Sequence, residues 1–341
     1  YAVESYQSLF LRAYFPLEYL VAVLNNGGGF YRPECYVHEA RMLGARVHPP
    51  CINRSGVANR IEGADIYLGL MYLRELEGRV MDRIVRQRQL GGAFSDLEDF
   101  LDRVPISIEQ LSILVRIDAF RSTGAEKHRL LWKAHLLLSR GGVADHPRLF
   151  PPQQTKFRIP SLHGTELETA FTQMELLGFC LCSPFDLLEE PPANRNGCRH
   201  FPEYMGRYID IYGYLVTVKN TKTHNGKRMH FATFIDLYGE VFDTVLFPPV
   251  AARYRFRGRG IYRSYGKVVS EFGFLSLEVL RMEKQGYIPD PRYADMKTAA
   301  KRLSLRQQED ALAKSEGKSQ PESQPESQPE SEPGRPRAKG S

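Results

Sequence analysis

The hydrophobic period of this 341-residue chain changes near residue 206, and the change divides the fold into two halves. Before it, apolar residues recur at helical spacing, as Leu167, Phe171 and Met174 do. After it, apolar residues alternate with other side chains in steps of two, beginning with Ile209 and Ile211. The first spacing gives a helix one apolar face, and the second gives a strand one apolar face. The sequence therefore predicts an all-α N-terminal half followed by a β domain.

The β domain is expected over residues 206–288 as a small five-stranded barrel. Two-residue alternation recurs in five short segments, near 209–213, 229–235, 241–246, 261–268 and 272–280. Asn225-Gly226 lies between the first two segments, and this dipeptide is a strong signal of a tight hairpin turn. Five short strands in so few residues are typical of a closed OB-type barrel.

The end of the chain has a different composition. From about residue 314 it repeats Ser-Gln-Pro-Glu three times, and it ends in Gly, Arg, Pro and Lys. Such a segment buries too little apolar surface to offset the entropy lost on ordering, so we expect a disordered tail. The chain as a whole has 42% hydrophobic and 25% charged residues, a globular balance that excludes a fibrous or fully disordered protein.

Positive charge is concentrated in the β domain. Residues 206–288 contain 13 Lys and Arg against seven Asp and Glu, whereas the whole chain has a formal net charge of +6. A basic segment attracts polyanions, because neutralising phosphates releases condensed counterions. Nucleic acid is the partner that this charge predicts. The alternative is that the excess charge only keeps the domain soluble.

The five cysteines are few and odd in number, which argues against a disulfide scaffold and for a reducing compartment. Zinc-binding residue types occur together at Cys180, Cys182, Cys198 and His200. Cys-x-Cys is a poor chelating spacing, so we expect buried thiols there and no metal. No stretch approaches 18 consecutive apolar residues, so no membrane partner is expected.

The hairpin around Asn225-Gly226 carries the strongest candidate nucleic-acid contacts. Four basic side chains and one aromatic flank the turn, namely Lys219, Lys222, Lys227, Arg228 and Phe231. OB-folds hold single strands by combining a basic groove with aromatic rings on which bases stack. Other aromatics nearby divide between core and surface, and they are Tyr212, Tyr214 and Phe234. A second basic edge is expected at Arg253, Arg255, Arg257 and Arg259, which are interleaved with Tyr254 and Phe256. The alternative is a protein-docking surface.

Four stretches of the helical half stand out as motifs. They are Ser-Tyr-Gln-Ser-Leu-Phe-Leu-Arg-Ala-Tyr-Phe-Pro-Leu-Glu-Tyr at 5–19, Glu-Ala-Arg-Met-Leu-Gly at 39–44, His-Pro-Pro-Cys-Ile-Asn at 48–53 and Gly-Ala-Phe-Ser-Asp-Leu-Glu-Asp-Phe at 92–100. In order and spacing they resemble the C-terminal part of bacterial DNA polymerase III alpha subunits, which are C-family polymerases. The resemblance continues at 213–216 and 240–247 and covers roughly residues 1–285.

The resemblance implies a domain order and a set of partners. The expected parts are the end of a fingers domain at 1–60, a tandem helix-hairpin-helix module at 61–140, a clamp-binding loop and linker helix at 141–205, an OB-fold domain at 206–288, and a linker with the disordered tail at 289–341. The implied partners are single-stranded template and primer-template DNA, a sliding clamp and other replicase subunits. The implied location is the bacterial cytoplasm, in association with the nucleoid.

The expected helix-hairpin-helix turns depart from the family pattern. Such modules bind the DNA backbone through the amides of a Gly-apolar-Gly turn, because glycine lets a phosphate approach closely. Here the first turn is Glu75-Leu76-Glu77 and the second is Asp118-Ala119-Phe120. Carboxylates repel a phosphate, so Arg74 and Arg79 beside the first turn are the expected DNA contacts. A packing module without DNA contact is the alternative.

Residues 146–150, His-Pro-Arg-Leu-Phe, resemble the clamp-binding pentapeptide of the family, which ends in two apolar residues and normally begins with Gln. His146, Leu149 and Phe150 are the expected clamp contacts. Two adjacent apolar side chains on a Gly- and Pro-rich loop stay exposed unless a partner pocket takes them. The alternative is a loop anchored within its own domain.

The palm carboxylates of the family are missing from this sequence. Two-metal phosphoryl transfer needs acidic residues that converge on Mg²⁺, and the family supplies them as Asp-x-Asp. This sequence contains no Asp-x-Asp, no Walker lysine loop and no Gly-x-Gly-x-x-Gly motif, so no catalytic residue is predicted. The acidic residues in 96–102 are expected to form a solvated helix face.

The chain begins at Tyr1 without an initiator Met, and we expect a fragment that does not polymerise alone and has no cofactor of its own. The resemblance implies a parent enzyme that adds dNTPs to a primer 3′ end with Mg²⁺ held elsewhere. Two alternatives stay open. One is a stand-alone, non-enzymatic DNA-binding or clamp-interacting protein, and the other is the same region of an error-prone C-family polymerase.

Overall fold

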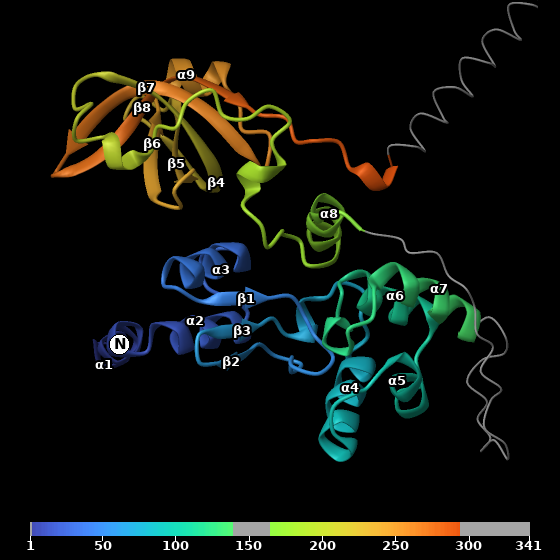
Figure 1. The fold of residues 1–341 in the computed structure, drawn as a ribbon. Helices are drawn as coiled ribbons and strands as arrows, with labels where there is room; N and C mark the ends of the chain where they lie inside the picture. Colours follow the sequence, from blue (N-terminus) through green and yellow to red (C-terminus); the bar gives the residue numbers. More distant parts are fainter. Residues whose placement is uncertain (1, 139–163, 294–341) are drawn as a thin grey trace, which may run out of the picture. The chain divides into compact units, whose positions relative to one another are not determined.

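The computed structural model describes residues 2–138 and 164–293 (Figure 1). The contacts between residues divide the chain into two compact units, Tyr1–Asp290 and Pro291–Ser341. The described residues of the second unit form one 3-10 helix, η5, at Pro291–Tyr293. The expected clamp contacts His146, Leu149 and Phe150 lie outside the described residues, and so does the tail that was expected to be disordered.

Three helices open the first unit, and prolines begin two of them. They are α1 at Ala2–Tyr14, α2 at Pro16–Asn25 and α3 at Pro33–Met42. Proline suits the first turn of a helix because the N–H that it lacks has no intrahelical partner there.

A small sheet follows these helices and is an addition to the predicted helical half. Its strands are β1 at Arg46–His48, β2 at Arg60–Glu62 and β3 at Asp65–Tyr67, in the order β1-β3-β2. Strands of three residues are too short to show a clear two-residue alternation, so the sequence did not reveal them.

The next segment is helical and contains the main core of this half. Its elements are η1 at Leu70–Tyr72, α4 at Gly78–Gly91, α5 at Leu97–Arg103, α6 at Ile108–Arg116, η2 at Arg121–Thr123, α7 at Lys127–Leu138 and α8 at Glu166–Leu176. Phe94, Phe100 and Phe120 are buried together, with neighbouring ring centroids 5.0 Å apart in edge-to-face pairs. Aromatic rings prefer this geometry because the positive ring edge meets the negative face.

The β domain is a closed five-stranded barrel. Two short helices, η3 at Pro184–Leu187 and η4 at Cys198–His200, lie between α8 and the barrel in the sequence. Its elements are β4 at Tyr208–Lys222, β5 at Arg228–Asp236, β6 at Val241–Leu246, α9 at Pro248–Arg253, β7 at Ile261–Glu271 and β8 at Phe274–Lys284. The strand order is β4-β5-β6-β8-β7, with β6 and β8 parallel and the other pairs antiparallel.

The barrel and the helical half before it confirm the predicted fold class. Inward-facing apolar side chains fill the barrel, and its largest fully buried members include Phe201, Phe234 and Tyr262. Two-residue alternation brings Phe234 and Tyr262 to the inner face of their strands, which is why the sequence revealed the barrel. Among the helices of the described residues, none has the length and apolar character needed to cross a bilayer.

Candidate nucleic-acid interface

The strands β4 and β5 form a hairpin that continues beyond the pairing of β4 with β7. β4 pairs with β7 up to Tyr214 and with β5 as far as Lys222, which lies opposite Arg228. Gly226 closes the turn at φ +72°, a left-handed conformation that glycine adopts without steric cost. The Thr223 amide donates to the Lys227 carbonyl at 2.8 Å. The turn predicted at Asn225-Gly226 is confirmed.

The register divides the predicted contact residues between the two faces of this hairpin. Lys222 pairs with Arg228, and Lys219 pairs with Phe231 three residues closer to the barrel. Because side chains alternate along a strand, Lys222 and Arg228 share one face with His230, whereas Lys219 and Phe231 share the other. The sequence grouped these residues correctly along the chain but did not separate the two faces.

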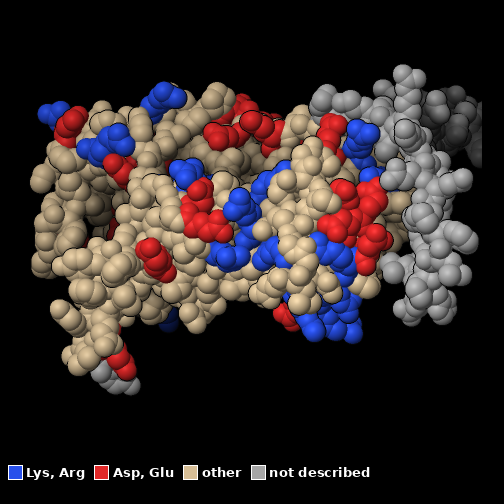
Figure 2. Space-filling view, turned by 60° about the horizontal axis from the view of Figure 1, so that its bottom comes forward, with Lys and Arg blue, Asp and Glu red and all other residues tan. Residues whose placement is uncertain are grey.

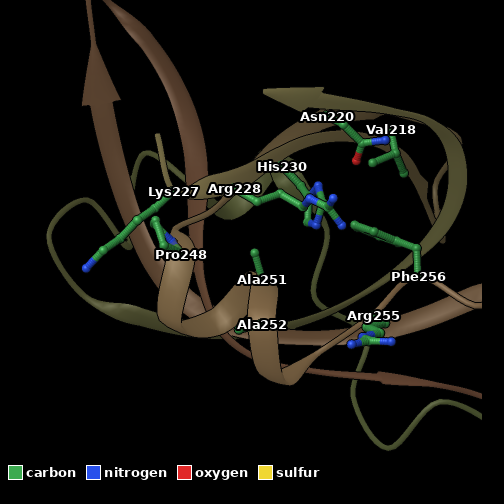
Figure 3. Close-up of a pocket in the computed structure, with 10 residues that line it drawn as sticks. All are labelled: Val218, Asn220, Lys227, Arg228, His230, Pro248, Ala251, Ala252, Arg255 and Phe256. Carbon is green, nitrogen blue, oxygen red and sulfur yellow. The ribbon is translucent and has the colours of Figure 1, made fainter. Parts of the chain in front are cut away.

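A cavity of about 760 Å³ lies on the first of these faces, between the hairpin, α9 and the segment that follows α9 (Figure 3). It is lined by Val218, Asn220, Lys227, Arg228, His230, Pro248, Ala251, Ala252, Arg255 and Phe256. In Figure 3 the Arg228 guanidinium lies among His230, Phe256 and Asn220, whereas the Lys227 side chain points away from them. The cavity therefore joins the hairpin to the arginine run that the sequence showed as a separate basic edge.

The cavity is cationic. Lys227, Arg228 and Arg255 line it, and no Asp or Glu from the described part of the chain does. Within residues 2–138 and 164–293, none of these three side chains takes part in an ion pair. Elsewhere on the barrel, by contrast, Arg263 binds Asp210 with an N···O distance of 2.6 Å. The cavity cations are thus available to an anionic ligand.

His230 is a cavity residue that no sequence motif indicates. The residue is only 9% exposed, and its Nδ1 atom is buried with no hydrogen-bond partner in residues 2–138 and 164–293. Burial, with a smaller contribution from the Arg228 charge, lowers the pKa of His230, so the ring is neutral at physiological pH. Its ring centroid lies 5.9 Å from that of Phe256. A lone histidine in a strand forms no motif, and the one available signal was its place on the inward-facing side of β5.

The aromatic residues near the hairpin divide between core and surface as the sequence suggested. Phe234 is buried in the barrel core and Tyr212 in a separate cluster with Leu188 and Ile261, whereas Phe231 is 42% exposed. Tyr214 donates a hydrogen bond from its hydroxyl to Glu34 of α3 at 3.1 Å. Burial raises the pKa of Tyr214 above its usual range, so the hydroxyl stays protonated as a donor. Phe231 is the member of this set that is free to stack on a base.

The arginine run after α9 is used in two ways. Arg255 lines the cavity, but Arg259 contacts Glu34 at 3.2 Å and the Gly178 carbonyl at 3.1 Å. The Arg257 amide donates to the Tyr262 hydroxyl at 2.8 Å. Alternating charge in the sequence therefore did not produce one continuous basic edge, because part of the run stabilises the fold.

The first helix-hairpin-helix turn is held from within the protein. Gln110 of α6 is buried, accepts from the Glu77 amide at 2.7 Å and donates to the Glu75 carbonyl at 2.8 Å. Arg74 lies against α8, where its guanidinium reaches the Glu175 carbonyl at 3.5 Å. Arg79 is exposed and pairs with Glu77 at 3.3 Å. Arg74 and Arg79 therefore lie in different surroundings. The Glu77 amide of the turn is already bound by Gln110.

The helical half presents mixed charge. On the face shown in Figure 2, Lys and Arg side chains lie beside Asp and Glu side chains. The acidic residues in 96–102 lie largely on the helix surface, as predicted. Asp96 caps α5 by accepting from the Asp99 amide, and Asp99 pairs with Arg103 at 3.1 Å. These carboxylates stabilise a helix start and a helix surface.

The residues considered as zinc ligands are not brought together as one set. The Cys180 thiol contacts the Cys182 carbonyl at 3.6 Å, whereas Cys198 lies near Asp236 and Glu240 of the barrel. Both oxygens of Asp236 already accept backbone amides, those of Tyr238 and Glu240 on Oδ1 and that of Cys198 on Oδ2. Asp236 thus organises a turn, and three backbone amides use three of the roughly four lone-pair sites of its carboxylate.

The turn between β7 and β8 exposes two phenylalanines, which no pattern in the sequence predicts. The turn between β7 and β8 places Phe272 at φ +51° with its side chain fully exposed, and Phe274 is 79% exposed. Large apolar side chains rarely occupy a left-handed, solvated turn. Alternation near 272–280 predicts a strand that includes residue 272, whereas β8 begins at Phe274.

Comparison with known proteins finds similarity between this chain and bacterial DNA polymerases. The family model of the helix-hairpin-helix motif matches residues 44–130. An error-prone DNA polymerase of Mycobacterium bovis is 28% identical over 264 residues, covering 73% of this chain and 23% of that protein. The DNA polymerase III subunit alpha of Thermus aquaticus is 32% identical over 142 residues, 40% of this chain and 12% of that protein. That of Aquifex aeolicus is 26% identical over 258 residues, 73% of this chain and 21% of that protein.

Solved structures give a weaker likeness. A single-stranded DNA-binding protein from Thermus aquaticus matches 24% of this chain and 41% of its own chain, with 14% identity and a TM-score of 0.22. A score this low supports no conclusion. The chain spans less than a quarter of the length of the polymerases it matches. The helix-hairpin-helix match, the barrel and these matches together establish that the chain is homologous to the C-terminal region of bacterial DNA polymerase III alpha subunits and error-prone DNA polymerases.

Proposed function

We propose that this chain is the DNA-holding C-terminal region of a C-family DNA polymerase and binds single-stranded DNA through its barrel. One observation carries the proposal: a cavity whose cations have no ion-pair partner among the described residues lies under the β4–β5 hairpin of a chain homologous to DNA polymerases. Cations without protein partners attract phosphates, and counterion release then favours binding.

The two faces of the hairpin have different roles in this proposal. A strand that crosses the hairpin tip meets Lys222, Lys227 and Arg228 on the cavity side. On the other side it meets Lys219, which neutralises a phosphate, and Phe231, whose exposed ring stacks on a base. The strand is thus held by its backbone and by base stacking, without a requirement for sequence.

The helix-hairpin-helix module contributes less in this proposal. Arg79 contacts a DNA phosphate when it leaves Glu77, an exposed pair that stabilises the protein little. Arg74 contributes little to DNA binding, because its guanidinium already contacts the Glu175 carbonyl of α8. The carboxylates of Glu75 and Glu77 oppose phosphate binding at this turn.

Nucleotidyl transfer belongs to another part of the parent enzyme in this proposal. That enzyme adds dNTPs to a primer 3′ end, with Mg²⁺ held by carboxylates outside this chain. The support is the partial coverage of the polymerase relatives together with the lack of Asp-x-Asp in this sequence. A cytoplasmic, nucleoid-associated replicase with further subunits is the setting that this assignment implies.

A tether to the sliding clamp completes the proposal. His146, Leu149 and Phe150 dock the loop in an apolar pocket of the clamp. Replacing Leu149 and Phe150 by Ala removes the two apolar anchors, so capture of this chain on immobilised clamp is expected to fall to background. Replacing His146 by Gln, the usual first residue, is expected to strengthen capture. Undiminished capture of the double variant would place the tether elsewhere.

Fluorescence anisotropy tests the proposed DNA binding. The probe is a labelled oligothymidylate of about 20 nucleotides, longer than the site of one OB domain. We expect binding at about 50 mM salt that weakens steeply as salt is raised. We also expect no primer extension when dNTPs and Mg²⁺ are supplied. No binding at low salt, or extension by the purified chain, would contradict the proposal.

An error-prone parent is the second candidate, and the match to the Mycobacterium bovis error-prone polymerase over 73% of this chain favours it. Depletion of the gene in the source bacterium distinguishes the two parents. Loss of DNA-damage-induced mutation with normal growth supports an error-prone parent, whereas arrest of growth supports a replicative one.

A further inference from the structure

We infer that the cavity between the β4–β5 hairpin and α9 holds a single nucleotide, with its phosphate at Arg228 and Arg255 and its base against Phe256. The inference deepens the proposed DNA binding and rests on it for the source of the nucleotide. The shared chemistry is that of a nucleoside phosphate. It is supplied either by one unpaired unit of a bound strand or by a free nucleotide.

The phosphate end of the site is built from two guanidinium groups. Arg228 comes from β5 and Arg255 from the segment after α9, and both line the cavity without an ion-pair partner among the described residues. A guanidinium presents parallel N–H groups whose spacing matches two phosphate oxygens. Lys227 adds positive charge at the rim, where Figure 3 shows its side chain directed outward.

The base end of the site is apolar and has room for a ring. Phe256 is held against Phe234 and Tyr262, at centroid distances of 6.4 and 5.6 Å, so its ring is fixed as a wall of the cavity. Ala251 and Ala252 of α9 are small and leave the opposite side open. A volume of about 760 Å³ is in the range of sites for molecules of nucleotide size.

The unpartnered atom of His230 points to a ligand with a polar edge. A buried polar atom without a hydrogen bond costs free energy, so native proteins rarely leave one unless a ligand or water completes it. The neutral ring offers Nδ1 as a donor or an acceptor, depending on its tautomer. Asn220 lies opposite His230 in the strand register and brings both an amide donor and an acceptor. Together they suit the polar edge of a nucleobase better than they suit a simple anion.

The experiment uses the full chain and four probes. Calorimetry measures the affinities of dTMP, thymidine and inorganic phosphate, and proton NMR follows the His230 ring with dTMP and with the oligothymidylate. The His230 signal is assigned with His230→Phe. We expect dTMP to bind at least about tenfold more tightly than thymidine or phosphate, because it engages both ends of the site.

Variants separate the two ends of the site. Arg228→Ala combined with Arg255→Ala is expected to weaken dTMP by at least about tenfold, the loss of charge-assisted hydrogen bonds. Phe256→Leu keeps an apolar side chain in the core and is expected to weaken dTMP but not phosphate. Arg207→Ala removes a barrel charge outside the cavity and is expected to change nothing. Thermal melting checks that each variant is folded.

The outcomes distinguish this inference from the proposed function. A His230 shift with both dTMP and the oligothymidylate, lost in the arginine double variant, supports both. Oligothymidylate binding without a His230 response overturns the nucleotide site and leaves the proposed DNA binding intact. Binding of dTMP without oligothymidylate binding supports the site with a free nucleotide and overturns the proposed function. Phosphate binding as tight as dTMP binding overturns the nucleotide assignment in favour of an anion site.

Discussion

Two residues of the helix-hairpin-helix module occupy conformations that usually belong to glycine. Glu75 has φ +65° and Asp118 has φ +62°, and each lies in a turn where the family resemblance implies glycine. A Cβ atom in the left-handed region clashes with the backbone, which costs about 1–2 kcal/mol per residue. The surrounding fold overrides this cost, since Gln110 holds the Glu75 carbonyl and Arg121 reaches the Asp118 carbonyl at 3.1 Å.

Glu75→Gly is expected to stabilise the protein by about 1 kcal/mol, because it removes the left-handed penalty and keeps the carbonyl bonded to Gln110. Glu75→Ala is the matched control, since it removes the same carboxylate but keeps the Cβ atom. Chemical denaturation measures both variants. Equal stability of the Gly and Ala variants would show that the turn is not strained.

Asp118→Asn is expected to stabilise the protein at neutral pH and to lose that advantage in acid. Burial raises the pKa of Asp118, so the folded state binds more protons than the unfolded state above about pH 4. Stability therefore falls as pH rises from the unfolded pKa through the folded pKa, and asparagine, which tolerates the left-handed region, has no charge to bury. Melting temperatures of both proteins across pH 3–8 measure the difference; a gain that is constant with pH would contradict this reading.

At the scale of elements, the β4–β5 hairpin depends on its turn. A Cβ atom added at Gly226 meets nothing within 4 Å, so the cost of any other residue there is conformational. Gly226→Val is expected to distort the turn, displace Lys227 and Arg228 and weaken oligothymidylate binding several-fold. Gly226→Asn is the control, because asparagine adopts positive φ more readily. Anisotropy compares the two, and equal binding by the valine variant would separate the turn from the site.

Elements with a clear period could be predicted from the sequence, and those set by tertiary contacts could not. The alternation from Ile209 onward predicted the barrel, and Asn225-Gly226 predicted its first hairpin. The strands β1 to β3 escaped notice because they are three residues long. The cavity could not be predicted, because α9 and Arg255 come close to His230 only when the barrel closes. No local sequence pattern encodes that approach.

At the scale of the whole first unit, Glu34 of α3 connects the helical half to the barrel. Its side chain is only 9% exposed and contacts Arg32 at 2.9 Å, Arg259 at 3.2 Å and the Tyr214 hydroxyl at 3.1 Å. A carboxylate this buried needs charged or hydrogen-bonding partners, because its charge is otherwise costly to remove from water. Some of the charges that the sequence predicts for DNA binding, such as Arg259, are therefore structural, and composition alone does not separate the two uses.

The central claim is that this barrel binds single-stranded DNA through the hairpin charges, which form no ion pair within the part of the chain that the structure describes. The slope of log affinity against log salt concentration counts the phosphate contacts, at about 0.7 per contact for a single strand. A control variant removes three positive charges from the helical half, at Arg12, Arg54 and Arg129, and should leave the slope unchanged. Replacing Lys222, Lys227 and Arg228 by Ala is predicted to reduce the slope by up to about 2. A slope that stays the same in the hairpin variant would contradict the account.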